Sequence, residues 1–124
     1  MTQGFNKVTL ANPNQILFAT NPYMAVGVVV SDSGLSADSN GKKILKAGTP
    51  VTGSLEDRNT AFTKTATSNA VGVLLHDVDV TSGSNNAELL IFGFVNLKNL
   101  DSDVQSLIDS TIKTALKGSV TFLK

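Results

Sequence analysis

Short apolar runs rich in β-branched residues, separated by polar turns, make up most of the chain. The runs Tyr23–Val30, Ala70–Leu75 and Ala87–Val95 have strand length and predict buried strands. A loop rich in Gly, Asn and Ser at Ser82–Asn86 separates the last two, so we expect them to be antiparallel neighbours. Shorter strands are predicted at Lys42–Leu45, Thr63–Thr67 and Val120–Leu123.

One helix is predicted, at about residues 102–117. Its apolar residues recur at helical spacing and form a single stripe: Val104, Leu107, Ile108, Ile112, Ala115 and Leu116. Ser102 with Gln105 fits a capping box at its start, and Gly118 is placed to be its C-terminal cap. The expected fold class is therefore mainly β (α+β), a compact β-sandwich or barrel-like domain with one C-terminal helix.

The N-terminal residues are polar, with scattered apolar positions, and the dipeptides Asn12-Pro13 and Asn21-Pro22 interrupt any helix. We predict an extended arm over residues 1–22 and a single β-rich domain over residues 23–124. An extended arm can add to an exposed sheet edge of a partner through main-chain hydrogen bonds. The candidate anchors are its apolar residues, with Phe5, Val8 and Leu10 as one set and Ile16 and Phe18 as a second.

Composition narrows the classes of partner. The 124 residues include 10 Lys and Arg and 10 Asp and Glu, and no basic cluster occurs, so we do not expect a nucleic acid partner. No apolar stretch has bilayer-spanning length, so we do not expect a membrane partner. The chain has no cysteine, which excludes disulfides and thiolate ligands. Only 16% of the residues are charged, which favours a surface partly covered by a partner.

His76 is the only histidine, and Asp77 and Asp79 follow it closely. An enzyme hypothesis would use His76 with Asp77 or Asp79 as a base and its orienting acid, or as metal ligands. Adjacent residues on a strand point to opposite faces, and two carboxylates do not complete a calcium site. We therefore interpret the Asp residues as acceptors for backbone N–H groups in a turn. Without a nucleotide-binding or nucleophile motif, we expect no catalytic residue, no cofactor and no metal.

Three segments occur in order along the chain: Ile44–Val51, Ala70–Thr81 and Ala87–Val95. The positions that mark the pattern are Gly48, Thr49, Pro50, Val71, Gly72, Asp77, Asp79 and Gly93. With the short helix, a Gly and a last apolar strand after them, these segments resemble the lambda-type tailed-phage head-decoration proteins.

The resemblance implies a structural virion protein rather than an enzyme. Such a protein is made in the host cytoplasm as a late protein, binds the major capsid protein on the outer surface of the expanded head, commonly as a homotrimer, and stabilises the capsid against internal DNA pressure. An alternative is a virion-displayed host- or glycan-binding module that uses the polar loops Ser31–Gly41 and Ser82–Asn86.

Overall fold

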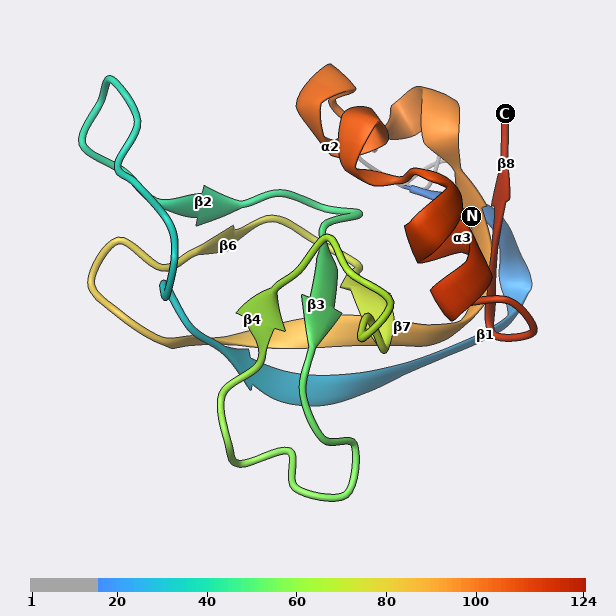
Figure 1. The fold of residues 1–124 in the computed structure, drawn as a ribbon, viewed down its shortest axis with the longest axis horizontal. Coiled ribbons are helices and arrows are strands. Elements are labelled where there is room, and N and C mark those ends of the chain that lie inside the picture. The colour runs from blue at the N-terminus through green and yellow to red at the C-terminus, as the bar shows by residue number, and fades with distance from the viewer. Residues whose placement is uncertain (1–15) are drawn as a thin grey trace, which may run out of the picture.

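The computed structural model describes residues 16–124, with the backbone alone for residues 18–22. It is mainly β, with 37% of the residues in strands and 14% in helices, as the apolar pattern predicts. The strands are β1 (Leu17–Val30), β2 (Ile44–Leu45), β3 (Pro50–Thr52), β4 (Thr63–Lys64), β5 (Gly72–Leu74), β6 (Val78–Asp79), β7 (Asn85–Asn96) and β8 (Val120–Leu123). The helices, grouped at one side in Figure 1, are the 3-10 helix η1 (Leu97–Asn99), α2 (Ser102–Leu107) and α3 (Ser110–Ala115).

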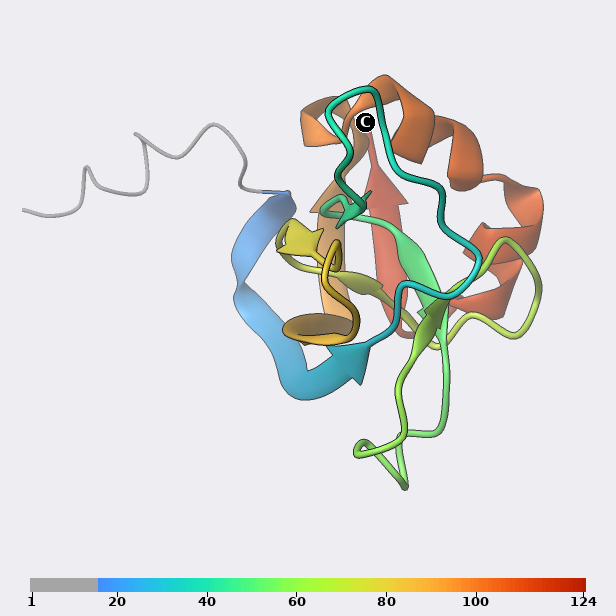
Figure 2. The same cartoon turned by 90° about the vertical axis from the view of Figure 1, so that its left-hand side faces the viewer.

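One antiparallel sheet forms the body of the protein, with the strand order β1-β7-β5-β3-β4, and β8 lies parallel to β7. Phe62, just before β4, forms a parallel bridge with Val30 of β1. Its N–H donates to the Val29 carbonyl at 2.7 Å, and the Ser31 N–H donates to the Phe62 carbonyl at 2.9 Å. The two ends of the sheet therefore meet, and the body is barrel-like; Figure 2 shows β1 curving round its left side.

The predicted antiparallel pairing of the two apolar runs around residues 82–86 is confirmed. In β5 and β7, Val73 lies opposite Leu90 and Leu74 lies opposite Leu89. Because side chains alternate along a strand, the two pairs face opposite sides of the sheet. Each pair belongs to a different buried cluster, so the sheet has a core on each of its faces.

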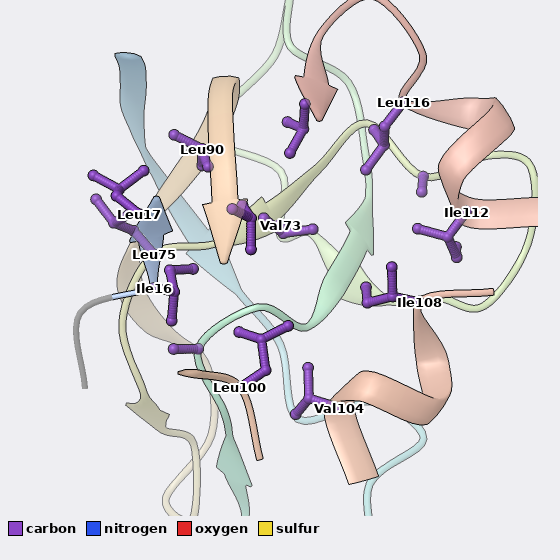
Figure 3. Packing of buried hydrophobic residues seen from close by; sticks show 14 residues of the cluster. Ile16, Leu17, Val73, Leu75, Leu90, Leu100, Val104, Ile108, Ile112 and Leu116 are labelled. Atoms are coloured by element: carbon purple, nitrogen blue, oxygen red, sulfur yellow. The ribbon is translucent and has the colours of Figure 1, made fainter. Parts of the chain in front are cut away.

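The inner cluster fills the barrel with Val28, Val30, Leu45, Val51, Phe62, Leu74, Val78, Val80 and Leu89. The outer cluster lies between the sheet and the helices (Figure 3) and contains Ile16, Leu17, Ala47, Ala70, Val73, Leu75, Leu90, Val95, Leu100, Val104, Ile108, Ile112, Leu116 and Val120. Each large apolar side chain that is fully buried stabilises the fold by about 1.5–3 kcal/mol. The helices are therefore held by the apolar stripe that the sequence predicts.

The structure places the boundary between arm and domain earlier than residue 22. β1 begins at Leu17, so residues 17–22 belong to the sheet. The Asn21-Pro22 dipeptide does not end the strand, because the pairing with β7 shifts register around it. The carbonyl of Ile16 accepts a hydrogen bond of 2.7 Å from the N–H of Asn96, at the end of β7. Residues 1–15 of the predicted arm lie outside the described residues.

The segment predicted as one helix at about residues 102–117 is two helices. Ile108 ends α2 with a non-helical ψ of 77°. The carboxylate of Asp109 accepts a hydrogen bond of 3.1 Å from the N–H of Ile112 and so caps a new helix, α3. An Asp at this position stabilises a helix start, which competes with continuation of α2. The buried residues of the predicted stripe are Val104, Ile108, Ile112 and Leu116.

The ends of this helical segment agree with the predictions only in part. Asp101, not Ser102, is the N-cap of α2, so the predicted capping box is wrong. The Gln105 side chain instead donates to the carbonyl of Leu100 at 2.9 Å. Gly118, two residues after the C-cap of α3, has the positive φ of 86° that a chain reversal there requires.

Candidate functional site

Part of the sequence pattern forms the turn between β2 and β3, and hydrogen bonds join this turn to the segment around β5. The Asp77 carboxylate accepts a hydrogen bond of 2.7 Å from the N–H of Ala47. The Gly48 N–H donates to the Leu74 carbonyl at 2.7 Å, and the Leu74 N–H donates to the Thr49 carbonyl at 3.0 Å. Ala47, Gly48, Thr49 and Asp77 are termed the turn latch below. Asp77 thus accepts from a turn 30 residues away in the chain, whereas the predicted hydrogen bond to a nearby backbone N–H is made by Asp79, which accepts from Thr81.

Two glycines of the pattern lie where a side chain would collide. Gly48 has a φ of +91°, and a Cβ there would lie 2.5 Å from Cδ2 of Leu100. In β5, a Cβ on Gly72 would lie 2.5 Å from the backbone oxygen of Leu90. These glycines therefore let the helical layer approach the turn latch and let β5 approach β7.

The other pattern residues pair and pack within the barrel. Thr49 is 3% exposed, and Pro50 lies opposite Val73 in the sheet. The N–H of Val71 donates to the Val51 carbonyl at 2.9 Å. Gly93 of β7 lies opposite Val120 of β8. All of these contacts are with other parts of the same chain.

His76 and the two aspartates that follow it do not converge. Asp77 faces Ala47, whereas Nε2 of His76 lies 3.5 Å from a carboxylate oxygen of Glu88 on the surface. The Asp79 carboxylate accepts a hydrogen bond of 2.9 Å from the Thr81 N–H, and hydrogen bonds from the Thr81 side chain and backbone lower the pKa of Asp79. Within residues 16–124, no group of three His, Cys, Asp or Glu residues is placed to hold a metal ion.

The structure tests only part of the predicted set of arm anchors. Phe5, Val8 and Leu10 lie outside the described residues, and for Phe18 only the backbone, in β1, is described. Ile16 is 1% exposed and belongs to the outer cluster. Its assignment as an arm anchor is therefore wrong, because the side chain packs between the sheet and the helices of its own domain. The local sequence does not reveal this packing.

A charge cluster that the sequence analysis did not single out joins α2 to the turn latch. Nζ of Lys46 lies 3.1 Å from a carboxylate oxygen of Asp101 and 3.1 Å from one of Asp103. The hydrogen bonds that Lys46 donates to these carboxylates raise the pKa of Lys46. Burial alone would raise the pKa of Asp103, but the hydrogen bond and charge of Lys46, together with hydrogen bonds from the backbone N–H groups of Asp103 and Val104, outweigh burial and lower that pKa. Lys46 and Asp103 are 57 residues apart, so no local pattern indicates the contact.

Three large apolar side chains on β1 and β7 are exposed. Tyr23, Met24 and Phe92 are 45%, 56% and 41% exposed, and Met24 lies opposite Phe92 across β1 and β7. The run Tyr23–Val30 is a strand as predicted, but only Val28 and Val30 in it are buried, and Tyr23, Met24 and Gly27 are exposed.

Two surface depressions lie beside loops. One, of about 520 Å³, is lined by Gly27–Val29, residues 55–59, Asn86 and Ala87. The other, of about 580 Å³, is lined by Lys42, Asp79 and residues 81–85, which include most of a loop assigned to ligand contacts in the glycan-binding alternative. No aromatic side chain lines either depression, so neither offers an aromatic face for a sugar ring to stack on.

Comparison with known proteins gives no relative: no protein-family model matches the chain, and no curated protein matches it. Among the helices in the described part of the chain, none is long and apolar enough to cross a membrane. The geometry and the sequence pattern are therefore the basis for assigning a function.

Proposed function

We propose that this chain is a structural virion protein that binds the outer surface of the expanded capsid of a tailed phage and stabilises it against internal DNA pressure. The observation that carries the proposal is the turn latch. Asp77 and Gly48, which mark the resemblance to the lambda-type decoration proteins, build the framework of a small barrel. The residues on which the resemblance rests therefore have structural roles in this fold, which supports their use as a pattern.

A compact body of this kind suits a clamp. Side chains cover both faces of the sheet, in the inner and outer clusters, and closely packed interiors are hard to deform. Phe5, Val8 and Leu10, in the segment before Ile16, anchor the body to the major capsid protein. In a homotrimer, three such anchors act together and raise avidity by about 10²–10⁴ over one. The shell then resists pressure because several contacts must break at once.

Binding to heads tests the proposal. The full chain is mixed with expanded, undecorated heads assembled from tailed-phage major capsid proteins, and the bound fraction is measured after sedimentation. We expect saturable, stoichiometric binding, with unexpanded heads as the matched control that binds less. If the protein remains in the supernatant with every expanded shell, the proposed function is wrong.

Deletion of residues 1–10 tests the role of the anchors. We expect at least tenfold weaker binding to expanded heads and an unchanged melting temperature, because the deletion keeps every residue of the two buried clusters that the structure describes in residues 16–124. Undiminished affinity of the deletion variant would contradict anchoring by this segment.

A further inference from the structure

Asn40 is followed directly by a glycine, and no other asparagine in the sequence is. The backbone nitrogen of the residue after an asparagine can attack the side-chain amide carbon and close a five-membered succinimide ring. Glycine favours this reaction because it has no Cβ to obstruct the approach of the two groups. Asn12 and Asn21 precede prolines, which have no N–H, so these two asparagines cannot react in this way. The sequence therefore marks Asn40 as the candidate for this modification.

The turn that contains Asn40 and Gly41 lies on an exposed loop between β1 and β2. Residues 36–42 are all exposed, and Figure 1 shows this loop projecting from the barrel beside β2. A Cβ placed on Gly41 would meet nothing within 4 Å, and the φ of Gly41 is +77°. Packing against the barrel therefore does not restrain the turn, and water reaches it.

Asp38 makes the hydrogen bonds that hold the reacting groups. The Gly41 N–H, which supplies the attacking nitrogen, donates to the Asp38 carbonyl at 2.9 Å. The Asp38 carboxylate accepts hydrogen bonds from the N–H of Asn40 at 2.8 Å and from that of Lys42 at 3.0 Å. The Asp38 N–H donates to the Lys42 carbonyl at 2.8 Å. The Gly41 nitrogen therefore reacts only when this turn opens.

We propose that Asn40 is a site of spontaneous deamidation and that the turn held by Asp38 sets its rate. In the opened turn, the Gly41 nitrogen gives its proton to water or hydroxide and forms a bond to Cγ of Asn40. The bond from Cγ to the side-chain nitrogen breaks, and that nitrogen leaves as ammonia. Water then breaks one of the two bonds that join the ring nitrogen to a carbonyl carbon. Breakage of the new bond to Cγ gives aspartate, and breakage of the original peptide bond gives isoaspartate. Water is consumed and ammonia is released, with no oxidation or reduction.

Either product changes the charge of the loop, because a carboxylate replaces a neutral amide. Backbone hydrogen bonds from Lys42 and Asn40 lower the pKa of Asp38, whereas the charge of Asp79 acts to raise it. The new carboxylate thus enters a region where two carboxylates already repel each other. In isoaspartate the side-chain CH₂ also becomes part of the backbone, which lengthens the turn that Asp38 holds. The modification therefore alters the loop that leads into β2, and it does not depend on the proposed function.

Ageing of the full chain tests the proposal. The protein is incubated in mildly alkaline buffer and digested at intervals. Mass spectrometry follows the peptide that contains Asn40, and chromatography separates the aspartate and isoaspartate products. We expect both products to accumulate at Asn40 in the folded wild type. We expect at least threefold faster accumulation in the chain unfolded in guanidinium chloride, because unfolding releases the Gly41 N–H from Asp38.

Two variants test the role of Asp38. Asp38→Ala removes the acceptor for two N–H groups of the turn, and we expect deamidation at least threefold faster than in the wild type. Asp57→Ala is the matched control, because it removes the same charge from another exposed loop, between β3 and β4; we expect an unchanged rate at Asn40. Circular dichroism spectra that match the wild type confirm that the variants are folded.

Each other outcome contradicts a stated part of the proposal. If the folded wild type gains no product while the unfolded chain is converted, Asn40 is not a site in the native protein. Equal rates in the folded and unfolded wild type overturn control of the rate by the turn, and this comparison needs no variant. Equal rates in Asp38→Ala and the wild type overturn the role of Asp38. Equal acceleration by Asp57→Ala overturns that role too, since loss of any negative charge then suffices. None of these measurements uses heads, so a failure to bind capsids leaves the proposal unaffected.

Discussion

The turn latch predicts a large effect of Gly48→Ala on stability. The φ of Gly48 is +91°, and a left-handed conformation costs a non-glycine residue about 1–2 kcal/mol. The new Cβ would also lie 2.5 Å from Cδ2 of Leu100 and 3.2 Å from Cγ1 of Val104. Overpacking of this kind costs typically about 1–3 kcal/mol. We therefore expect a total loss of about 2–5 kcal/mol, a large part of the roughly 5–15 kcal/mol that stabilises a domain.

Three other glycines separate the two causes. Gly34 has a φ of +79° with nothing within 4 Å of its Cβ position, so Gly34→Ala carries the backbone cost alone. In Gly72→Ala, the collision at 2.5 Å with the Leu90 backbone carries the packing cost alone. Gly27 has open space around it and no left-handed backbone, so Gly27→Ala should be neutral within about 0.5 kcal/mol.

Urea unfolding followed by far-ultraviolet circular dichroism measures these losses. With an m value of about 1.5 kcal/mol/M, a loss of about 3 kcal/mol moves the midpoint by about 2 M. We expect a lower urea midpoint for Gly48→Ala than for Gly34→Ala, because only Gly48→Ala carries both costs. The midpoint of Gly27→Ala should match that of the wild type. A Gly48→Ala protein as stable as Gly34→Ala would refute the close approach of Leu100 to the turn latch.

Further predictions concern single contacts and pH. Asp77→Ala removes the acceptor for the Ala47 N–H and should lower the free energy of unfolding by about 1 kcal/mol, whereas Asp77→Asn keeps an acceptor and should lose less; equal losses in urea titrations would contradict the latch. Ile16→Ala should cost about 2–5 kcal/mol, because the side chain is buried, and a neutral result would contradict its place in the outer cluster. The pKa of the Asp103 carboxyl lies below its ordinary value of 3.8, because the hydrogen bond and charge of Lys46, with backbone hydrogen bonds, outweigh burial. The ionised Asp103 carboxylate therefore stabilises the folded protein at pH values above 3.8. This stabilisation is lost as the pH falls through the lowered pKa of the folded state. We expect the urea midpoint to drop between pH 7 and pH 3, and to drop less in Lys46→Met; an equal drop would contradict the ion pair.

Local sequence patterns predicted those elements whose own residues decide them. The run Val120–Leu123 is β8 to the residue, and the apolar stripe that includes Ile112 and Leu116 is buried as its spacing predicts. The predictions failed where a contact between residues far apart in the sequence determines the local structure. The predicted boundary after residue 22 is one example: β1 begins at Leu17, because Leu17 and Ala19 pair with Val95 and Phe94 of β7.

The candidate surfaces were harder to predict than the strands. The collision that makes Gly48 necessary involves Leu100, and the charge cluster joins Lys46 to a helix far along the chain, so neither has a local signal. Which strand edge is open depends on the strand order of the whole sheet. Met24 therefore looks like the start of a buried strand in the sequence and is half exposed in the structure.

Electron cryomicroscopy of expanded heads saturated with the full chain tests the central claim most directly, since it locates the protein on its partner. We expect added density on the outer surface of the shell, with one barrel per bound chain and the barrels grouped in threes. Bare outer surfaces at saturating protein would contradict it.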